Sequence, residues 1–172
     1  MREFVALDVG PADPVRRGAP EHLTVMFLGE VRAEQHAVIG PRLADVAATT
    51  PPFRLCLEGV GAFPSATRPR VVWIGVGTGR EEVVRLAEKV RAALASEVPG
   101  ETAPFVPHVT WFRVRSAEDA RAASEILSGR RTLPAPRAVA VGELLLKESI
   151  LGPGGAHHRT VAAFPLGGPA AP

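Results

Sequence analysis

Two short segments that share one pattern constrain the fold of this chain more than any other feature. Each has a histidine followed two positions later by a threonine, in His22-Leu23-Thr24-Val25 and His108-Val109-Thr110-Trp111. About half of the 172-residue length separates them, and each lies in an apolar run typical of a strand. Because side chains alternate across a strand, the His and Thr of each pair share one face. A fold of two similar halves would gather two imidazoles and two hydroxyls, a set suited to phosphate chemistry with one general base and one general acid.

The composition indicates a globular chain with no long basic tract. Hydrophobic residues make up 46% and charged residues 22%, and the net charge is +2. Arginine supplies 18 of the 20 basic residues, and Lys89 and Lys147 are the two lysines. Guanidinium groups suit phosphates, yet +2 does not argue for long nucleic acid, so a small phosphorylated ligand or an RNA end is sufficient. Neither a signal peptide nor a membrane span is evident, so we expect a cytoplasmic protein with no membrane partner and no obligatory protein partner.

Periodicity and turn residues predict an α+β fold with mainly antiparallel sheets. We expect strands over 4–7, 22–28, 53–60, 70–76, 106–114, 137–149 and 157–164, and helices over 33–48, 80–96 and 116–127. Gly40-Pro41 should start, kink or split the first helix. Loops should cover 10–21 and 61–69, and 167–172 reads as a disordered tail after a single domain over 1–166.

Six further segments, together with the paired motifs, resemble one known family. They are Phe4–Asp8, the extension of the first motif to Gly29, Gly59–Pro64, Arg68–Trp73, Pro104–Thr110 with Arg113, and Glu148-Ser149 followed by Gly154-Gly155 and Phe164–Leu166. In this order they resemble the two-histidine phosphoesterases, specifically the RNA 2′,3′-cyclic phosphodiesterases also called 2′-5′ RNA ligases. The resemblance implies a bilobal fold of two pseudo-symmetric lobes, each with an antiparallel sheet and helices, around a central cleft.

The resemblance also implies roles for residues. His22 would be the proton donor and His108 the proton acceptor, although the residues alone leave that order open, and Thr24 and Thr110 would bind the phosphate. Arg113 follows the second motif where the family often has arginine, but simple alternation puts it on the face opposite His108 unless the strand bulges. Arg70 at the edge of a Gly/Pro loop and Phe63 as a base-stacking ring are further candidates for substrate binding. Neither a metal nor another cofactor is expected, because no cluster of ligand-type residues accompanies His157-His158.

The chain departs from the family pattern in three places. Only the Pro/Gly-rich segment 10–21 stands where the family usually has a helix. Trp111-Phe112 replace a small aliphatic pair, and His158 occupies a position where an aromatic residue, often tyrosine, is common.

Three functions remain open on the residues. The first is hydrolysis of RNA 2′,3′-cyclic phosphate ends to 2′-phosphates, with minor reversible 2′-5′ ligation. The second is the same chemistry on a small cyclic nucleotide such as an ADP-ribose cyclic phosphate. The third is an RNA-end binding module without turnover, which would not need two titratable imidazoles.

Overall fold

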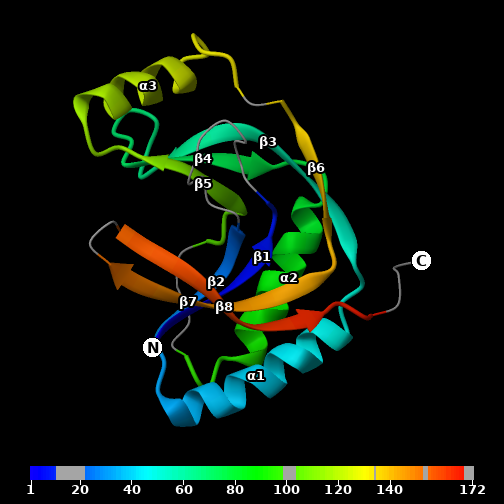
Figure 1. The fold of residues 1–172 in the computed structure, drawn as a ribbon. Helices are drawn as coiled ribbons and strands as arrows, with labels where there is room; N and C mark the ends of the chain where they lie inside the picture. Colours follow the sequence, from blue (N-terminus) through cyan, green and yellow to red (C-terminus); the bar gives the residue numbers. More distant parts are fainter. Residues whose placement is uncertain (11–21, 99–103, 134, 153–154, 169–172) are drawn as a thin grey trace.

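The computed structural model describes residues 1–10, 22–98, 104–133, 135–152 and 155–168. Eight strands and three helices are assigned within them (Figure 1). The strands are β1 (Arg2–Asp8), β2 (His22–Glu30), β3 (Phe53–Phe63), β4 (Val71–Val76), β5 (His108–Arg113), β6 (Arg137–Val141), β7 (Glu143–Gly152) and β8 (Gly155–Pro165). The helices are α1 (Ala33–Ala48), α2 (Arg80–Ala93) and α3 (Ala117–Leu127).

The strands form two four-stranded antiparallel sheets, which confirms the α+β prediction. The first sheet has the order β2-β1-β7-β8, and the second sheet has the order β5-β4-β3-β6. Strands β2 and β5 are therefore edge strands, and they contact each other where the two sheets meet. This arrangement brings the two motif-bearing strands together from opposite halves of the sequence.

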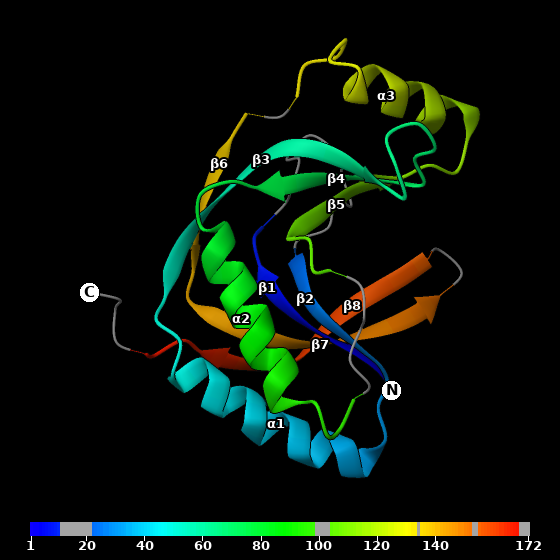
Figure 2. The ribbon, with the colours of Figure 1, turned by 180° about the vertical axis from the view of Figure 1, so that it is seen from behind.

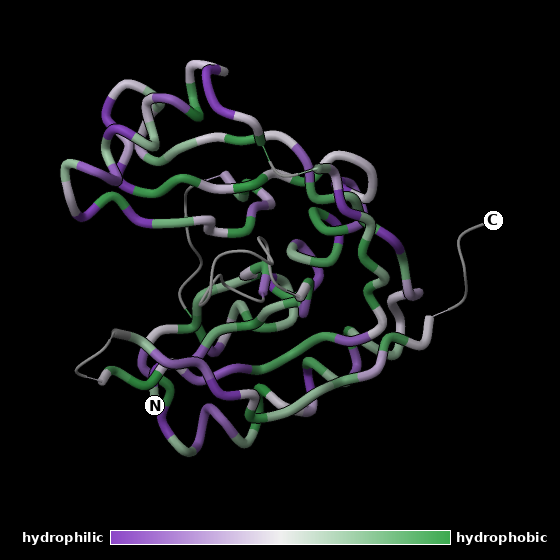
Figure 3. Tube along the Cα trace, turned by 45° about the horizontal axis from the view of Figure 1, so that its top comes forward, coloured by the Kyte–Doolittle hydropathy of each residue, from purple (hydrophilic) through white to green (hydrophobic). Residues whose placement is uncertain are grey.

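Helices cover the outer face of each sheet, so the inner faces look toward each other. Helix α1 packs against β7 and β8, and α2 packs against α1 and β2, as Figure 2 shows from behind. Helix α3 lies over the second sheet on the side away from the first sheet (Figure 1), and its Ala123 and Ile126 are buried. The buried side chains of both sheets and all three helices form one contiguous cluster, and the single domain over residues 1–166 stays a prediction. Figure 3 shows hydrophobic segments alternating with hydrophilic ones along the helices, the amphipathic pattern of elements that cover a core.

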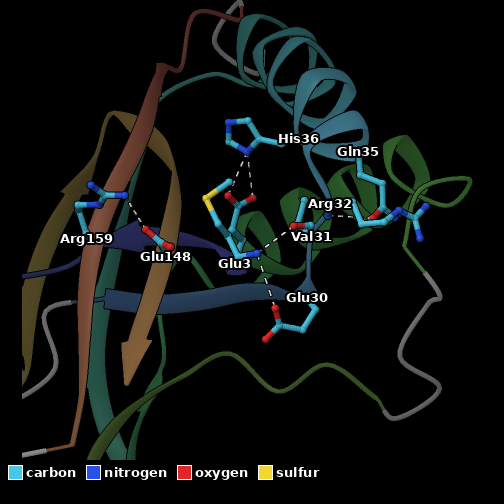
Figure 4. A network of polar contacts seen from close by, with 9 residues as sticks. Glu3, Glu30, Val31, Arg32, Gln35, His36, Glu148 and Arg159 are labelled. Carbon is cyan, nitrogen blue, oxygen red and sulfur yellow. Dashed lines mark hydrogen bonds and ion pairs between the residues drawn. The ribbon is translucent and has the colours of Figure 1, made fainter. Parts of the chain in front are cut away.

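The outer face of the first sheet also carries a small polar network (Figure 4). Glu3 is buried on β1, and Nδ1 of His36 on α1 lies 3.0 Å from its Oε1. On the same outer face, Nη2 of Arg159 lies 2.6 Å from Oε2 of Glu148. Two polar contacts therefore lie on the side of the sheet that faces away from the two motifs, although Oε1 of Glu3 has no hydrogen-bond partner among the described residues.

The helix starts agree with the sequence where a local signal exists. Ser116 caps α3 as expected: its Oγ accepts from the backbone N–H of Asp119 at 3.1 Å, and the Asp119 carboxylate accepts from the Ser116 N–H. Pro41 lies inside α1, which continues through it as one assigned helix. The prolyl ring costs one helical hydrogen bond, and the buried residues Ile39, Leu43 and Val46 anchor the helix on both sides of it.

Three sequence expectations need correction. The single strand expected over 137–149 is two strands, β6 and β7, which join different sheets on either side of Gly142. Strand β3 continues to Phe63, into the segment expected to be a loop, because residues 60–63 pair with β4. Gly167 and Gly168 donate backbone hydrogen bonds to Ala47 O and Thr50 O, so the tail expected from residue 167 begins with two anchored residues. The loop expected over 10–21 and the end of the tail, 169–172, lie outside the described residues apart from Gly10.

Candidate active site

The two histidines occupy equivalent positions in the two sheets. His22 is the first residue of β2, and His108 is the first residue of β5. His22 lies opposite Asp8 of β1, and His108 lies opposite Gly75 of β4. We call the face that each histidine occupies the site face of its sheet. Figure 1 shows α1 and α3 on the sides of the two sheets that face away from each other.

Both motif strands bulge by one residue directly after the threonine. In β2, Ala6 pairs with Thr24 and Val5 with Met26, so Val25 is the extra residue. In β5, Trp73 pairs with Thr110 and Val72 with Phe112, so Trp111 is the extra residue. A bulge restarts the alternation of side chains, and the third residue after each threonine therefore returns to the site face.

Arg113 is the residue that the second bulge brings to the site face. It lies opposite Val71, which shares its face of β4 with Trp73 and Gly75, the partners of Thr110 and His108. Simple alternation would put Arg113 on the other face. The sequence allowed a bulge as the exception, and the structure contains that bulge. The corresponding residue of β2 is Phe27, which lies opposite Phe4 and is 58% exposed. The two pseudo-equivalent positions thus carry a cation in one lobe and an apolar ring in the other.

Aromatic rings surround His108. The ring centroid of Phe63 lies 4.9 Å from that of His108, and the centroid of Trp73 lies 5.9 Å away. Nδ1 of His108 lies 2.7 Å from the carbonyl oxygen of Val106. Since a carbonyl can only accept, Nδ1 carries the proton of this bond and Nε2 is the free nitrogen of the neutral ring. Burial lowers the pKa of His108, and the bond to Val106 opposes that shift.

Gly61 makes room for the Trp73 indole beside His108. A Cβ on Gly61, which lies opposite Trp73 on β3, would meet the ring at 2.1 Å, whereas a Cβ on Gly75 would be in ordinary contact with it at 3.4 Å. The ring therefore occupies space over Gly61 that a side chain would otherwise fill. Its Nε1 is buried and has no hydrogen-bond partner among the described residues. Leaving such a donor unpaired costs about 1–3 kcal/mol, which marks this position as one shaped by more than packing.

Ionisable groups surround His22. Its ring centroid lies 4.8 Å from that of His158 on β8, edge to face, and 5.0 Å from that of Phe4 on β1. The pKa of His22 is lowered to about 4, mainly by burial and then by the charges of His158 and Lys147, while the Asp8 carboxylate opposes the shift. The pKa of His158 is also lowered, by burial and then by Lys147 and His157. These surroundings therefore favour neutral imidazoles at neutral pH.

The structure gathers most of the residues predicted from the sequence and adds three. His22 with Thr24, and His108 with Thr110, Arg113 and Phe63, occupy the two site faces. Arg70 is different: it is exposed, precedes β4, and is tied by its backbone to Phe63 and Val114.

The three additions are His158, Lys147 and Trp73. Two features of the sequence could have pointed to them. His158 departs from the family pattern, and Lys147 is one of two lysines in the chain. Their proximity to the motifs depends on strand pairing, which no local pattern reports. Among the described residues, no group of three or more His, Cys, Asp or Glu side chains is arranged to hold a metal ion.

Comparison with known proteins identifies the class of protein. The sequence profile of the 2′-5′ RNA ligase superfamily matches residues 7–148. A protein from Aeropyrum pernix named RNA 2′,3′-cyclic phosphodiesterase is 38% identical over 141 residues, which cover 81% of this chain and 78% of that protein. One of the same name from Archaeoglobus fulgidus is 35% identical over 186 residues, covering 95% of this chain and 99% of that protein. The chain belongs to the 2′-5′ RNA ligase superfamily, and the resemblance inferred from its motifs is confirmed.

Solved structures give the same fold. The crystal structure of TT0787 from Thermus thermophilus superposes with a TM-score of 0.74 at 28% identity, covering 98% of this chain and 99% of that one. The crystal structure of Escherichia coli LigT complexed with 3′-AMP superposes with a TM-score of 0.71 at 27% identity, covering 96% and 97%. The predicted bilobal two-histidine phosphoesterase fold is thereby confirmed. Within the described residues, every helix is too short or too polar to cross a membrane.

Proposed function

We propose that this chain hydrolyses the 2′,3′-cyclic phosphate at an RNA 3′ end to a 2′-phosphate, by acid–base catalysis with His22 and His108 and without a metal ion. The observation that carries the proposal is the matched construction of β2 and β5. Each edge strand begins with a histidine, continues to a threonine on the same face, and bulges at the next residue. The names of the relatives from Aeropyrum pernix and Archaeoglobus fulgidus support the same reaction.

The chemistry needs one proton removed and one proton supplied. Water attacks the phosphorus of the strained five-membered diester while His108 accepts a proton from that water. The bond from phosphorus to the ribose 3′ oxygen breaks, and His22 gives its proton to that oxygen, which leaves the 2′-phosphate. A positioned acid or base contributes about 10²–10⁴-fold in rate, so the two together supply a large part of the acceleration.

The surroundings of the two rings support these roles. With Nδ1–H of His108 directed at Val106 O, Nε2 of the neutral ring is free to accept the proton of water. His22, with a pKa of about 4 in these surroundings, must gain its proton when substrate binds. A phosphate brings negative charge next to the ring, and a nearby opposite charge raises an imidazole pKa. The donor role of His22 is therefore coupled to binding.

The remaining predicted residues bind and orient the phosphate and its nucleotide. Thr24 and Thr110 each donate a hydroxyl hydrogen bond to a non-bridging oxygen, where charge develops in the transition state. Arg113 supplies a guanidinium from the end of β5. Phe63, packed against His108, offers a ring for the base, and Arg70 adds a charge at the end of the β4–β5 ladder. If the 5′-hydroxyl of a second RNA end takes the place of water, the same proton transfers break the bond from phosphorus to the 3′ oxygen and form a 2′-5′ phosphodiester, which is the minor ligation.

A turnover assay with excess chelator tests the proposal. An oligonucleotide ending in a 2′,3′-cyclic phosphate and a 2′,3′-cyclic mononucleotide are compared, and the product phosphate is located on the 2′ or the 3′ oxygen. We expect 2′-phosphate products at rates that the chelator does not change. Activity that disappears with chelator and returns with zinc or magnesium would contradict the metal-free mechanism. Saturable binding of the oligonucleotide with no product would leave an RNA-end binding module.

A further inference from the structure

The hairpin of β7 and β8 extends the site face beyond His22. Lys147 on β7 lies opposite Phe4 on one side and opposite Thr160 on the other, and Ser149 lies opposite His158. Phe4 shares its face of β1 with the partners of His22 and Thr24, which are Asp8 and Ala6. Lys147, Thr160 and His158 therefore stand on the site face of the first sheet.

These side chains converge on His22. The ring of Phe4 contacts both histidines, with centroid distances of 5.0 Å to His22 and 5.2 Å to His158. The charge of Lys147 lowers the pKa of both histidines, so its ammonium lies within electrostatic range of each ring. A phosphate held by His22 and Thr24 would thus have a cation beside it on the hairpin.

The charge on Lys147 lacks a countercharge. Its Nζ lies 3.2 Å from Oγ1 of Thr160, a neutral partner, and no carboxylate in the described part of the chain forms an ion pair with it. The neighbouring Glu148 points to the opposite face, where it pairs with Arg159 at 2.6 Å (Figure 4). The contact between Lys147 and Thr160 is exposed to solvent, so the ammonium is accessible, and a bound anion would supply the missing partner.

We propose that Lys147, together with Thr160 and His158, forms a second anion subsite, which binds the phosphate on the 5′ side of the ribose that carries the 2′,3′-cyclic phosphate. The inference rests on the proposed function and adds that the preferred substrate carries a second phosphate on its 5′ oxygen. On such a nucleotide the 2′ and 3′ oxygens are already used, so any other phosphate is attached through the 5′ oxygen. That group is a phosphodiester in RNA and a terminal phosphate or pyrophosphate in a small cyclic nucleotide.

The test compares three substrates with the wild-type protein and with Lys147→Met. They are adenosine 2′,3′-cyclic phosphate, its 5′-phosphorylated form, and the dinucleotide ApA with a terminal 2′,3′-cyclic phosphate. The quantity compared is the preference, the ratio of kcat/KM with the second phosphate to kcat/KM without it. A charge-assisted contact predicts a wild-type preference of about 10-fold or more, which should fall to near 1 in Lys147→Met. A larger preference for the 5′-phosphorylated mononucleotide would identify the bound group as the terminal phosphate of a small nucleotide. A larger preference for ApA would identify it as the phosphodiester of RNA.

Two variants control for charge and for folding. Lys147→Arg keeps a cation and should retain most of the preference. Arg159→Gln removes a charge one strand away on the outer face and should leave the preference unchanged. High salt should reduce the preference of the wild type and have no such effect on Lys147→Met, since exposed charges are screened. A preference that survives in Lys147→Met, a wild-type preference of 1, or an equal loss on all three substrates would overturn the subsite.

A binding measurement separates this inference from the proposed reaction. Calorimetry compares adenosine 2′-phosphate with adenosine 2′,5′-bisphosphate, neither of which needs turnover. The bisphosphate should bind about 10-fold more tightly to the wild type and equally to Lys147→Met. If no substrate is hydrolysed but this difference is found, the reaction is wrong and the subsite stands. If hydrolysis occurs and the two ligands bind equally, the reaction stands and the subsite is wrong.

Discussion

The strand pairs β1–β2 and β4–β5 have the same backbone construction but different surroundings. Each places a histidine at the start of an edge strand and bulges after the threonine. Around His108 the contacts are two aromatic rings and a backbone carbonyl. Around His22 they are a second imidazole, a phenyl ring and the charges of Lys147 and Asp8.

Under the proposed mechanism, this difference would let a pseudo-symmetric fold support an asymmetric reaction. The hydrogen bond from Nδ1 of His108 to Val106 O fixes the tautomer of that ring. The pKa of His22 is set first by burial and then by neighbouring charges, so we expect a bound anion to raise it. The two imidazoles have equivalent strand positions, and the side chains around them differ.

Removal of either imidazole is the strongest test of this comparison. His22→Ala and His108→Ala should each lower kcat by roughly 10²–10⁴-fold, measured by turnover of a 2′,3′-cyclic phosphate. The double variant should lose much less than the product of the two, because both groups act on one transition state. His157→Ala, an exposed histidine on the outer face of β8, is the matched control and should keep full activity. Near-normal turnover of either single variant would mean that its histidine is not catalytic and that its strand repeats the backbone construction alone.

Loss of a threonine hydroxyl should lower kcat less than loss of an imidazole. It also tests whether the two lobes bind the phosphate equally. Thr24→Val and Thr110→Val keep the shape of the side chain and should each reduce kcat by about 10²-fold, near the effect of removing one donor to a developing oxyanion. Thr→Ser at either position keeps the donor and should restore most of the rate. Equal losses would mean that both strands hold the phosphate alike. An effect at one position alone would assign the non-bridging oxygens to that lobe.

A methyl group on Gly61 should disturb the His108 lobe alone. The new Cβ would meet the Trp73 ring at 2.1 Å, so the indole must move, and we expect Gly61→Ala to lower the free energy of unfolding by about 1–3 kcal/mol. Urea denaturation measures the loss, and Trp fluorescence reports the movement of the ring. Gly142→Ala, where nothing lies within 4 Å of the added Cβ, is the control and should be close to neutral. Unchanged stability and fluorescence in Gly61→Ala would show that the ring does not depend on this glycine.

Replacement of His158 should produce the smallest effect and show whether charge distinguishes the His22 lobe. His158→Phe keeps a ring against His22 but removes the charge that His158 carries when it is protonated, so the pKa of His22 should rise from about 4 while burial still holds it below 6.5. NMR titration of the ring measures that shift, and the pKa of His108 in the same spectra is the internal control. The acidic limb of kcat/KM, which reports the lower of the two pKa values, should move to higher pH. For a rise of about one pKa unit, which corresponds to about 1.4 kcal/mol, the change in kcat/KM at neutral pH should be about tenfold or less. A His22 pKa that stays the same or falls would assign the shift to burial and Lys147.

The sequence determined the features that depend on neighbouring residues. The period of two put His22 with Thr24 and His108 with Thr110 on one face, and the structure keeps both pairs. The helical period and the Ser116 cap placed α3 within a residue of its start. The paired motifs, together with the six further segments in order along the chain, were sufficient to identify the family.

Tertiary structure decided everything that depends on which strands pair. The run 137–149 is largely apolar along the chain, and only the different partners of β6 and β7 reveal that it crosses between sheets. The place of Arg113 depends on a bulge that is visible only in the pairing of β5 with β4. The ring of His158 lies 4.8 Å from that of His22, although the two residues come from opposite ends of the chain and β1 and β7 lie between their strands; both rings also contact Phe4 of β1. The side-chain period determines which residues share one face of a strand. Which strands lie beside that face depends on long-range hydrogen bonding, which no short segment encodes.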